Sequence, residues 1–95
     1  IVLEVVQGEG GIYPIDEAFL RKARALADRY NALLVFDEIQ CGVGRVGKYF
    51  AYQMYEPAVM PDVMVTAKPI AAGLPLGVIC ANEKAAVSIA AGMHG

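Results

Sequence analysis

Three segments of the sequence place polar side chains directly after apolar, strand-like runs. They are the glycine-rich turn from Gln7 to Gly11, the stretch from Asp37 to Gln40, and Lys68. In α/β proteins, ligands bind beyond the carboxyl ends of the strands. We therefore expect these three segments to converge on one ligand site.

Lys68 and Asp37 are the two side chains with the most specific chemistry. Lys68 stands between Ala67 and Pro69, and a lysine held among small or apolar residues has a lowered pKa and attacks carbonyl groups. A nucleophilic lysine and an acidic partner for a pyridinium nitrogen are the protein groups that pyridoxal phosphate requires. Taken singly, Asp37 is as typical of a turn as of a cofactor site, and Lys68 is more typical of a solvated surface. The hypothesis of a pyridoxal phosphate site therefore depends on the two residues together.

The loop from Gly42 to Lys48 allows two nucleotide interpretations. Its glycines have the spacing of a dinucleotide fingerprint, and Asp62 follows at a suitable distance, but the loop neither follows a strand directly nor opens a long helix. It also fits the first seven positions of a phosphate-binding P-loop, although Tyr49 stands where a Ser or Thr hydroxyl must reach magnesium. A nucleotide-binding α/β module thus stays open as an alternative of another class, beside a plain glycine-rich turn with positive φ angles.

The apolar pattern predicts strands that alternate with helices. Apolar runs, the first nearly continuous as in a sheet covered on both faces, predict strands over Ile1 to Val6, Ala32 to Phe36, Val63 to Thr66 and Leu76 to Ala81. Helical patterns lie over Asp16 to Tyr30, Tyr49 to Tyr55 and Glu83 to Ala91. The buried stripe of the first helix is predicted to consist of Phe19, Ala23, Leu26 and Tyr30. This order indicates an α/β fold with a mostly parallel sheet and crossover helices.

The composition excludes several classes of protein. Of the 95 residues, 57% are hydrophobic and 19% are charged, which excludes disorder, and a net charge of -2 leaves no basic surplus for nucleic acid. No run approaches the ~18 apolar residues of a membrane span, and Glu4 within the opening run predicts that it is no signal peptide. Cys41 and Cys80 predict reduced thiols in a cytoplasmic protein. The apolar content is high for so short a chain, so we expect a piece of a larger protein.

Three longer segments carry a resemblance to a known family. QGEGG, LLVFDEIQCGVGRVGKYFAY and PDVMVTAKPIAAGLPLGVICANE resemble the class III pyridoxal-phosphate-dependent aminotransferases along essentially the whole chain. The resemblance implies that residues 1–95 are a central fragment of the large, cofactor-binding domain of a fold-type-I transferase, with no second domain. It also implies pyridoxal 5'-phosphate as the cofactor, an amino acid and a 2-oxo acid as substrates, and a homodimer with the active site at its interface.

The resemblance gives expected roles to five residues. Lys68 would bind the cofactor covalently and then shuttle a proton between the substrate carbon and the cofactor. Asp37 would pair with the pyridine nitrogen and keep it protonated. Gln40 would hydrogen-bond the phenolic oxygen of the ring, Ile39 would pack against the ring face, and Glu9 would pair with a mobile arginine on the substrate side. No metal site is expected.

Some features depart from the family or are missing. The run from Pro69 to Gly73 replaces the usual glycines, and Pro69 predicts an extended Lys68, because the residue before a proline avoids the helical region. The ending GMHG resembles the start of a segment that reaches the cofactor of a neighbouring subunit, with His94 expected to be structural. The phosphate loop, the ring-stacking aromatic and the substrate arginine are missing, so we expect this chain alone to be inactive.

Overall fold

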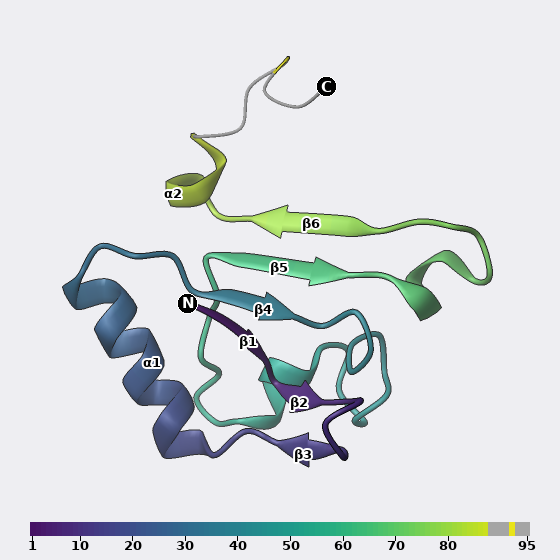
Figure 1. Cartoon of the computed structure of the whole chain (residues 1–95), viewed down its shortest axis with the longest axis horizontal. Helices are drawn as coiled ribbons and strands as arrows, with labels where there is room; N and C mark the ends of the chain where they lie inside the picture. The colour runs from purple at the N-terminus through teal and green to yellow at the C-terminus, as the bar shows by residue number, and fades with distance from the viewer. Residues whose placement is uncertain (88–91, 93–95) are drawn as a thin grey trace.

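Four strands form one sheet in the computed structural model, with the order β1-β4-β5-β6 (Figure 1). The structure describes residues 1–87 and 92. The strands of this sheet are β1 (Val2–Glu4), β4 (Val35–Asp37), β5 (Val63–Thr66) and β6 (Val78–Ala81). β1, β4 and β5 are parallel, and β6 is antiparallel to β5. The predicted α/β fold with a mostly parallel sheet is therefore confirmed.

The parallel register brings the carboxyl ends of three strands to one edge of the sheet. Glu4 pairs with Asp37, and Asp37 pairs with Val65 on its other side. Beyond β1 the chain enters β2 (Val6–Gln7), which pairs antiparallel with β3 (Tyr13–Pro14). The glycine-rich turn is thus the tip of a small hairpin that follows β1 (Figure 1).

The first predicted helix is present as α1 (Glu17–Arg29). Asp16 caps its N-terminus, because the Asp16 carboxylate accepts a hydrogen bond from the Phe19 backbone N–H at 2.9 Å. Tyr30 is the C-terminal cap residue. The predicted limits of the helix are thus confirmed as its two cap positions.

The predicted buried face of α1 is wrong. The residues that α1 buries are Leu20, Ala23 and Ala27. Of the predicted stripe only Ala23 is buried, and the exposed members are Phe19, Leu26 and Tyr30. Both sets have helical spacing, so the sequence pattern alone does not choose between them. The set that is buried in the structure contains two alanines.

Among the sheet strands, only β5 has the predicted bounds. The first predicted strand, over residues 1–6, divides at Val5, where the chain passes from β1 into β2. The second begins later than predicted, because the Ala32 backbone N–H still donates to the Ala27 carbonyl of α1 at 2.8 Å. The fourth is also shorter and begins at Val78. The prediction that the first strand is buried on both faces is wrong for this chain, since Val2 is 70% exposed.

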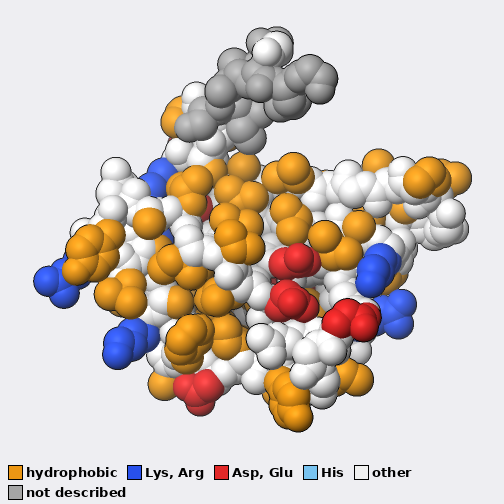
Figure 2. Space-filling view, viewed as in Figure 1, with side chains coloured by type: hydrophobic (Ala, Val, Ile, Leu, Met, Phe, Trp, Pro, Cys, Tyr) orange, Lys and Arg blue, Asp and Glu red, His pale blue; other side chains and the backbone are white. Residues whose placement is uncertain are grey.

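The hydrophobic core lies between α1 and one face of the sheet. Leu20 of α1 and Phe36 of β4 belong to the same fully buried cluster. By strand alternation and register, Val2 and Ile79 lie on the opposite face, where both are exposed. Figure 2 shows hydrophobic side chains gathered across the face toward the viewer. Within the described residues, one sheet face is packed and the other is open.

The remaining helices are short. They are the 3-10 helices η1 (Ala51–Met54) and η2 (Lys68–Ala71) and the helix α2 (Glu83–Ala86). η1 lies inside the predicted helix over residues 49–55, and α2 begins where predicted. Residues 88–91 of the predicted last helix, and His94, lie outside the described residues. Among the described residues, no helix has both the length and the apolar character needed to cross a membrane.

Candidate active site

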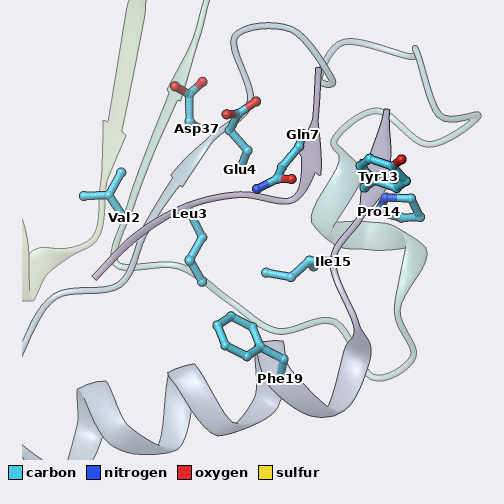
Figure 3. Close-up of a pocket in the computed structure, with 9 residues that line it drawn as sticks. All are labelled: Val2, Leu3, Glu4, Gln7, Tyr13, Pro14, Ile15, Phe19 and Asp37. Atoms are coloured by element: carbon cyan, nitrogen blue, oxygen red, sulfur yellow. The ribbon is translucent and has the colours of Figure 1, made fainter. Parts of the chain in front are cut away.

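Asp37 ends β4 and lines a cavity of about 480 Å³. Figure 3 shows its carboxylate beside that of Glu4, with Gln7 and the apolar side chain of Leu3 also lining the cavity. One carboxylate oxygen, Oδ1, accepts a hydrogen bond from the Ile39 backbone N–H at 2.9 Å. The turn after β4 therefore orients the Asp37 side chain, and its second oxygen makes no hydrogen bond within the described residues.

Lys68 begins η2 just after β5 and has a positive φ of 50°. The predicted extended conformation is therefore wrong. The chain turns from β5 directly into η2 at this position, and Lys68 takes the left-handed conformation that the turn demands. A non-glycine residue in this region is strained, and Lys68 shares this conformation with four other non-glycine residues of the described part, Val43 among them. The Lys68 side chain is exposed, so the dry surroundings expected from its neighbours are not provided by the described residues.

Gln40 and the glycine-rich turn interlock. The Gln40 Nε2 donates a hydrogen bond to Glu9 Oε1 at 3.3 Å. A Cβ atom placed on Gly8 would lie 1.4 Å from Gln40 Oε1, so only a glycine leaves room for this amide. Glu9 and Gln40 also line a second cavity of about 390 Å³, together with Arg45.

The structure brings the predicted residues together in part. Glu9 contacts Gln40 directly, and Ile39 contacts Asp37 through its backbone. Asp37 ends β4 and Lys68 follows the adjacent parallel strand β5, at the same edge of the sheet. Asp37 lines the first cavity, Glu9 and Gln40 line the second, and Lys68 and Ile39 line neither.

The loop from Gly42 to Lys48 has the geometry of a turn. Val43, Gly44 and Gly47 have positive φ angles of 55°, 89° and 82°. The loop is followed by η1, a 3-10 helix of 4 residues, whereas both nucleotide motifs place their phosphates at the start of a substantial helix. The interpretation as a glycine-rich turn is therefore confirmed, and the loop lacks the helix that the alternative requires.

Asp62, the acidic residue of the dinucleotide interpretation, is occupied elsewhere. Its Oδ2 accepts hydrogen bonds from Arg24 and from the Leu34 backbone N–H, both at 2.8 Å. Its Oδ1 accepts one from Asn82 Nδ2 at 2.8 Å. Burial alone would raise the pKa of Asp62, but these hydrogen bonds outweigh it and lower the pKa to about 2. Asp62 thus joins α1, β4 and the start of α2 rather than binding a ligand.

The cysteines are both free thiols, Cys41 buried and Cys80 exposed. Burial raises the pKa of the Cys41 thiol. Within residues 1–87 and 92, the structure holds no group of three or more His, Cys, Asp and Glu side chains that could bind a metal ion.

Glu38 is the one residue beside the site whose importance sequence reasoning missed. Its side chain is completely buried, and both carboxylate oxygens accept backbone hydrogen bonds at the start of η1. A signal was available in the alternation of β4. Phe36 faces the core, and a period of two places Glu38 on the same side and Asp37 on the other.

The donor set of this edge fits a phosphorylated pyridine aldehyde. Lys68 would offer a primary amine to the aldehyde, Asp37 a carboxylate to a protonated ring nitrogen, and Gln40 an amide to the phenolic oxygen. The absence of a side chain at Gly8 leaves room for the Gln40 amide.

Known sequences of one family are similar to this chain along its whole length. The sequence model described as aminotransferase class-III matches residues 1–95. A succinylornithine transaminase of Citrobacter koseri is 48% identical over the whole chain, which covers 23% of that relative. An acetylornithine aminotransferase of Rhodobacter capsulatus is 53% identical, again over the whole chain and 24% of the relative. The chain therefore spans less than a quarter of the length of these relatives.

Solved structures give the same result. The N-acetylornithine aminotransferase from Stenotrophomonas maltophilia matches 92% of this chain with a TM-score of 0.84 and 44% identity, over 23% of its own length. The ornithine delta-aminotransferase of Plasmodium falciparum matches 99% of this chain with a TM-score of 0.87 and 35% identity, over 24% of its own length. Because the family model matches all 95 residues, the chain belongs to the class III aminotransferases.

Proposed function

We propose that this chain is the central part of the large, cofactor-binding domain of a pyridoxal-phosphate-dependent aminotransferase. Residues 1–95 would belong to that one domain. The enzyme would transfer the amino group of N-acetylornithine to 2-oxoglutarate, a reaction of arginine biosynthesis. The observation that carries the proposal is the placement of Asp37 at the end of β4 and of Lys68 just after β5, the adjacent parallel strand. The names of similar relatives support the choice of substrate.

In this proposal Lys68 and Asp37 carry the chemistry. The Lys68 amine would hold the cofactor covalently and would then move a proton to and from the substrate carbon. Asp37 is oriented by the Ile39 N–H at 2.9 Å, and its second oxygen would hold a proton on the ring nitrogen. The bound cofactor supplies an electron sink for the substrate carbanion.

Gln40, Ile39 and Glu9 orient the reacting groups. The Gln40 amide would donate to the phenolic oxygen of the ring, and the Ile39 side chain would pack against the ring face. Glu9, 3.3 Å from Gln40, lies on the substrate side and pairs with an arginine that this chain does not contain.

The whole enzyme is proposed to be a cytoplasmic homodimer with its active site at the interface. The chain alone holds neither a phosphate loop nor a substrate arginine and is expected to be inactive. Within the same chemistry the runner-up is another ω-amino acid aminotransferase, acting on ornithine, 4-aminobutyrate or a protected lysine precursor. Similarity to ornithine aminotransferase structures supports that second candidate.

The test is a substrate comparison with the full-length enzyme. With 2-oxoglutarate as acceptor, kcat/KM is measured for N-acetylornithine, ornithine, 4-aminobutyrate and an N-acylated lysine precursor. The highest value is expected with N-acetylornithine, and Lys68→Ala should abolish turnover of every donor. A preference for another donor would replace the proposed substrate, and full activity of Lys68→Ala would overturn the mechanism.

A further inference from the structure

Glu38 is a buried acid to which the proposed reaction gives no role. Its side chain has 0% exposure, and no ion pair to it is found within the described part of the chain. A buried carboxylate without a cation is costly unless hydrogen bonds satisfy it. The hydrogen-bond donors to the Glu38 carboxylate therefore indicate its role.

The Glu38 carboxylate holds the first turn of η1. Its Oε2 accepts a hydrogen bond from the Ala51 N–H at 2.6 Å, and its Oε1 accepts one from the Tyr52 N–H at 2.9 Å. Burial raises the pKa of Glu38 above its usual value, and these two hydrogen bonds oppose that rise. Each oxygen thus has one backbone donor, and a segment 13 residues further along the chain is fixed to the end of β4.

The backbone of Glu38 is held from two more directions. Its N–H donates to the Val65 carbonyl of β5 at 2.8 Å, and its carbonyl accepts from the Gly42 N–H at 3.0 Å. A Cβ atom on Gly42 would lie 2.7 Å from the Glu38 carbonyl oxygen and 3.1 Å from its Oε2. Glu38 is therefore fixed to β5, to the turn after β4 and to η1.

These contacts adjoin the segments that carry Asp37, Gln40 and Lys68. Asp37 precedes Glu38 and faces the opposite side of the sheet, and Gln40 follows in the same turn. Val65, which accepts the Glu38 N–H, lies in the strand that leads to Lys68. We propose that Glu38 is a positioning residue that fixes the Asp37 carboxylate relative to Lys68. This inference rests on the proposed function.

Each carboxylate oxygen of Glu38 faces a backbone N–H, so both oxygens must accept hydrogen bonds. In Glu38→Gln one oxygen becomes an NH2 group that faces a backbone N–H, so one hydrogen bond is lost and two donors meet. The shape stays nearly the same. In the full-length holoenzyme we expect this variant to raise the cofactor dissociation constant about tenfold, which equals ~1.4 kcal/mol.

The matched control is Glu56→Gln, which makes the same change at an exposed position. The readouts are the cofactor dissociation constant and the pH midpoint of the bound cofactor's absorption change. A displaced Asp37 would hold the ring proton less well, and loss of that positive charge would make the nitrogen that links the lysine to the cofactor easier to protonate. The midpoint should therefore move to higher pH in Glu38→Gln and stay unchanged in Glu56→Gln.

A double-mutant cycle with Asp37→Asn separates positioning from general stability. If Glu38 acts through Asp37, Glu38→Gln changes the absorption midpoint much less in the Asp37→Asn background. Gly42→Ala, which pushes on Glu38 without removing it, should shift the midpoint in the same direction and serves if Glu38→Gln does not fold. An unchanged midpoint and dissociation constant with only a lower Tm, or equal effects in both backgrounds, would overturn the inference. Absence of lysine-bound cofactor in the unmodified enzyme would overturn the proposed function instead.

Discussion

The Gln40 amide occupies the space that a side chain at position 8 would need. Gly8 does not have a left-handed φ, so its requirement comes from space and not from backbone strain. A side chain at this position would meet the amide oxygen at 1.4 Å. Gly8 leaves room for the Gln40 amide, and Gln40 in turn holds the glycine-rich turn through its hydrogen bond to Glu9.

The first prediction concerns Gly8→Ala in the full-length enzyme. The new methyl group should displace the Gln40 amide and remove its proposed hydrogen bond to the phenolic oxygen of the ring. Cofactor binding should then weaken about tenfold, the size expected for one hydrogen bond to a charged group. The dissociation constant is measured by titrating the apoenzyme with cofactor. Gly77→Ala is the control, because its Cβ would lie 3.9 Å from the Thr66 carbonyl oxygen in ordinary contact. Equal affinity of Gly8→Ala and the unmodified enzyme would contradict the assigned place of Gln40.

The sequence predicted where the candidate residues lie in the fold better than it predicted their conformations and burial. Asp37 and Lys68 were placed at one sheet edge because strand order and polar strand ends are visible in the sequence. The positive φ of Lys68 was not predictable, since the proline after it signals only what a residue avoids. The burial of Glu38 was missed because an acidic pair after a strand resembles a solvated turn, whereas its partners in η1 come from a distant part of the chain.

At the scale of elements, Asp62 joins helix α1 to the sheet. Its carboxylate binds Arg24 of α1, the Leu34 N–H before β4 and Asn82 before α2. These contacts lie at the amino ends of β4 and β5, opposite the candidate site. Asp62 therefore stabilises the scaffold without touching the reacting groups.

The second prediction concerns the pH dependence that Asp62 produces. Its pKa of about 2 lies below the usual value of an unfolded aspartate, so its contribution is complete above that usual value and is lost as pH falls toward 2. The contribution at neutral pH should be about 2 kcal/mol. Unfolding of the full-length protein by urea is measured at pH 7 and at acidic pH for the unmodified protein and Asp62→Asn.

The difference between these two proteins should be large at pH 7 and should shrink as the pH falls. Asp28→Asn is the control, since Asp28 binds the same Arg24 at 2.6 Å but is exposed, and exposed ion pairs contribute little. A difference that does not change with pH would contradict the role of Asp62 as a buried, ionised carboxylate.

Helix and strand positions were largely visible in the sequence, and packing was not. The caps of α1 and the bounds of β5 follow from local signals, namely an aspartate at the helix start and a short apolar run. Which stripe of α1 is buried depends on the sheet it meets, and Phe19 is exposed in spite of its spacing. The end of β1 depends on the hairpin beyond it, which pairs Val6 with Pro14.

For the whole molecule, the open sheet face accounts for the high apolar content. Val2 and Ile79 are 70% and 69% exposed on that face, and the chain spans 23% and 24% of the relatives named above. Large contiguous apolar surfaces mark places where other parts of a protein pack. We propose that the rest of the enzyme covers this face.

The third prediction compares residues 1–95 alone with the full-length protein. The isolated chain should bind a dye that fluoresces on apolar surfaces, and the folded full-length protein should bind much less per molecule. Dye titration with light scattering as a control for aggregation checks this. Weak dye binding by a monomeric isolated chain would contradict the proposal that its apolar face is normally covered.

The central claim is that Lys68 holds the cofactor, and one measurement tests it most directly. The full-length protein is reduced with borohydride, digested, and its peptides are mapped by mass. The account predicts a phosphopyridoxyl group on Lys68 and on no other lysine of this chain. Recovery of the cofactor on a different lysine, or an unmodified Lys68 in protein prepared with excess cofactor, would contradict it.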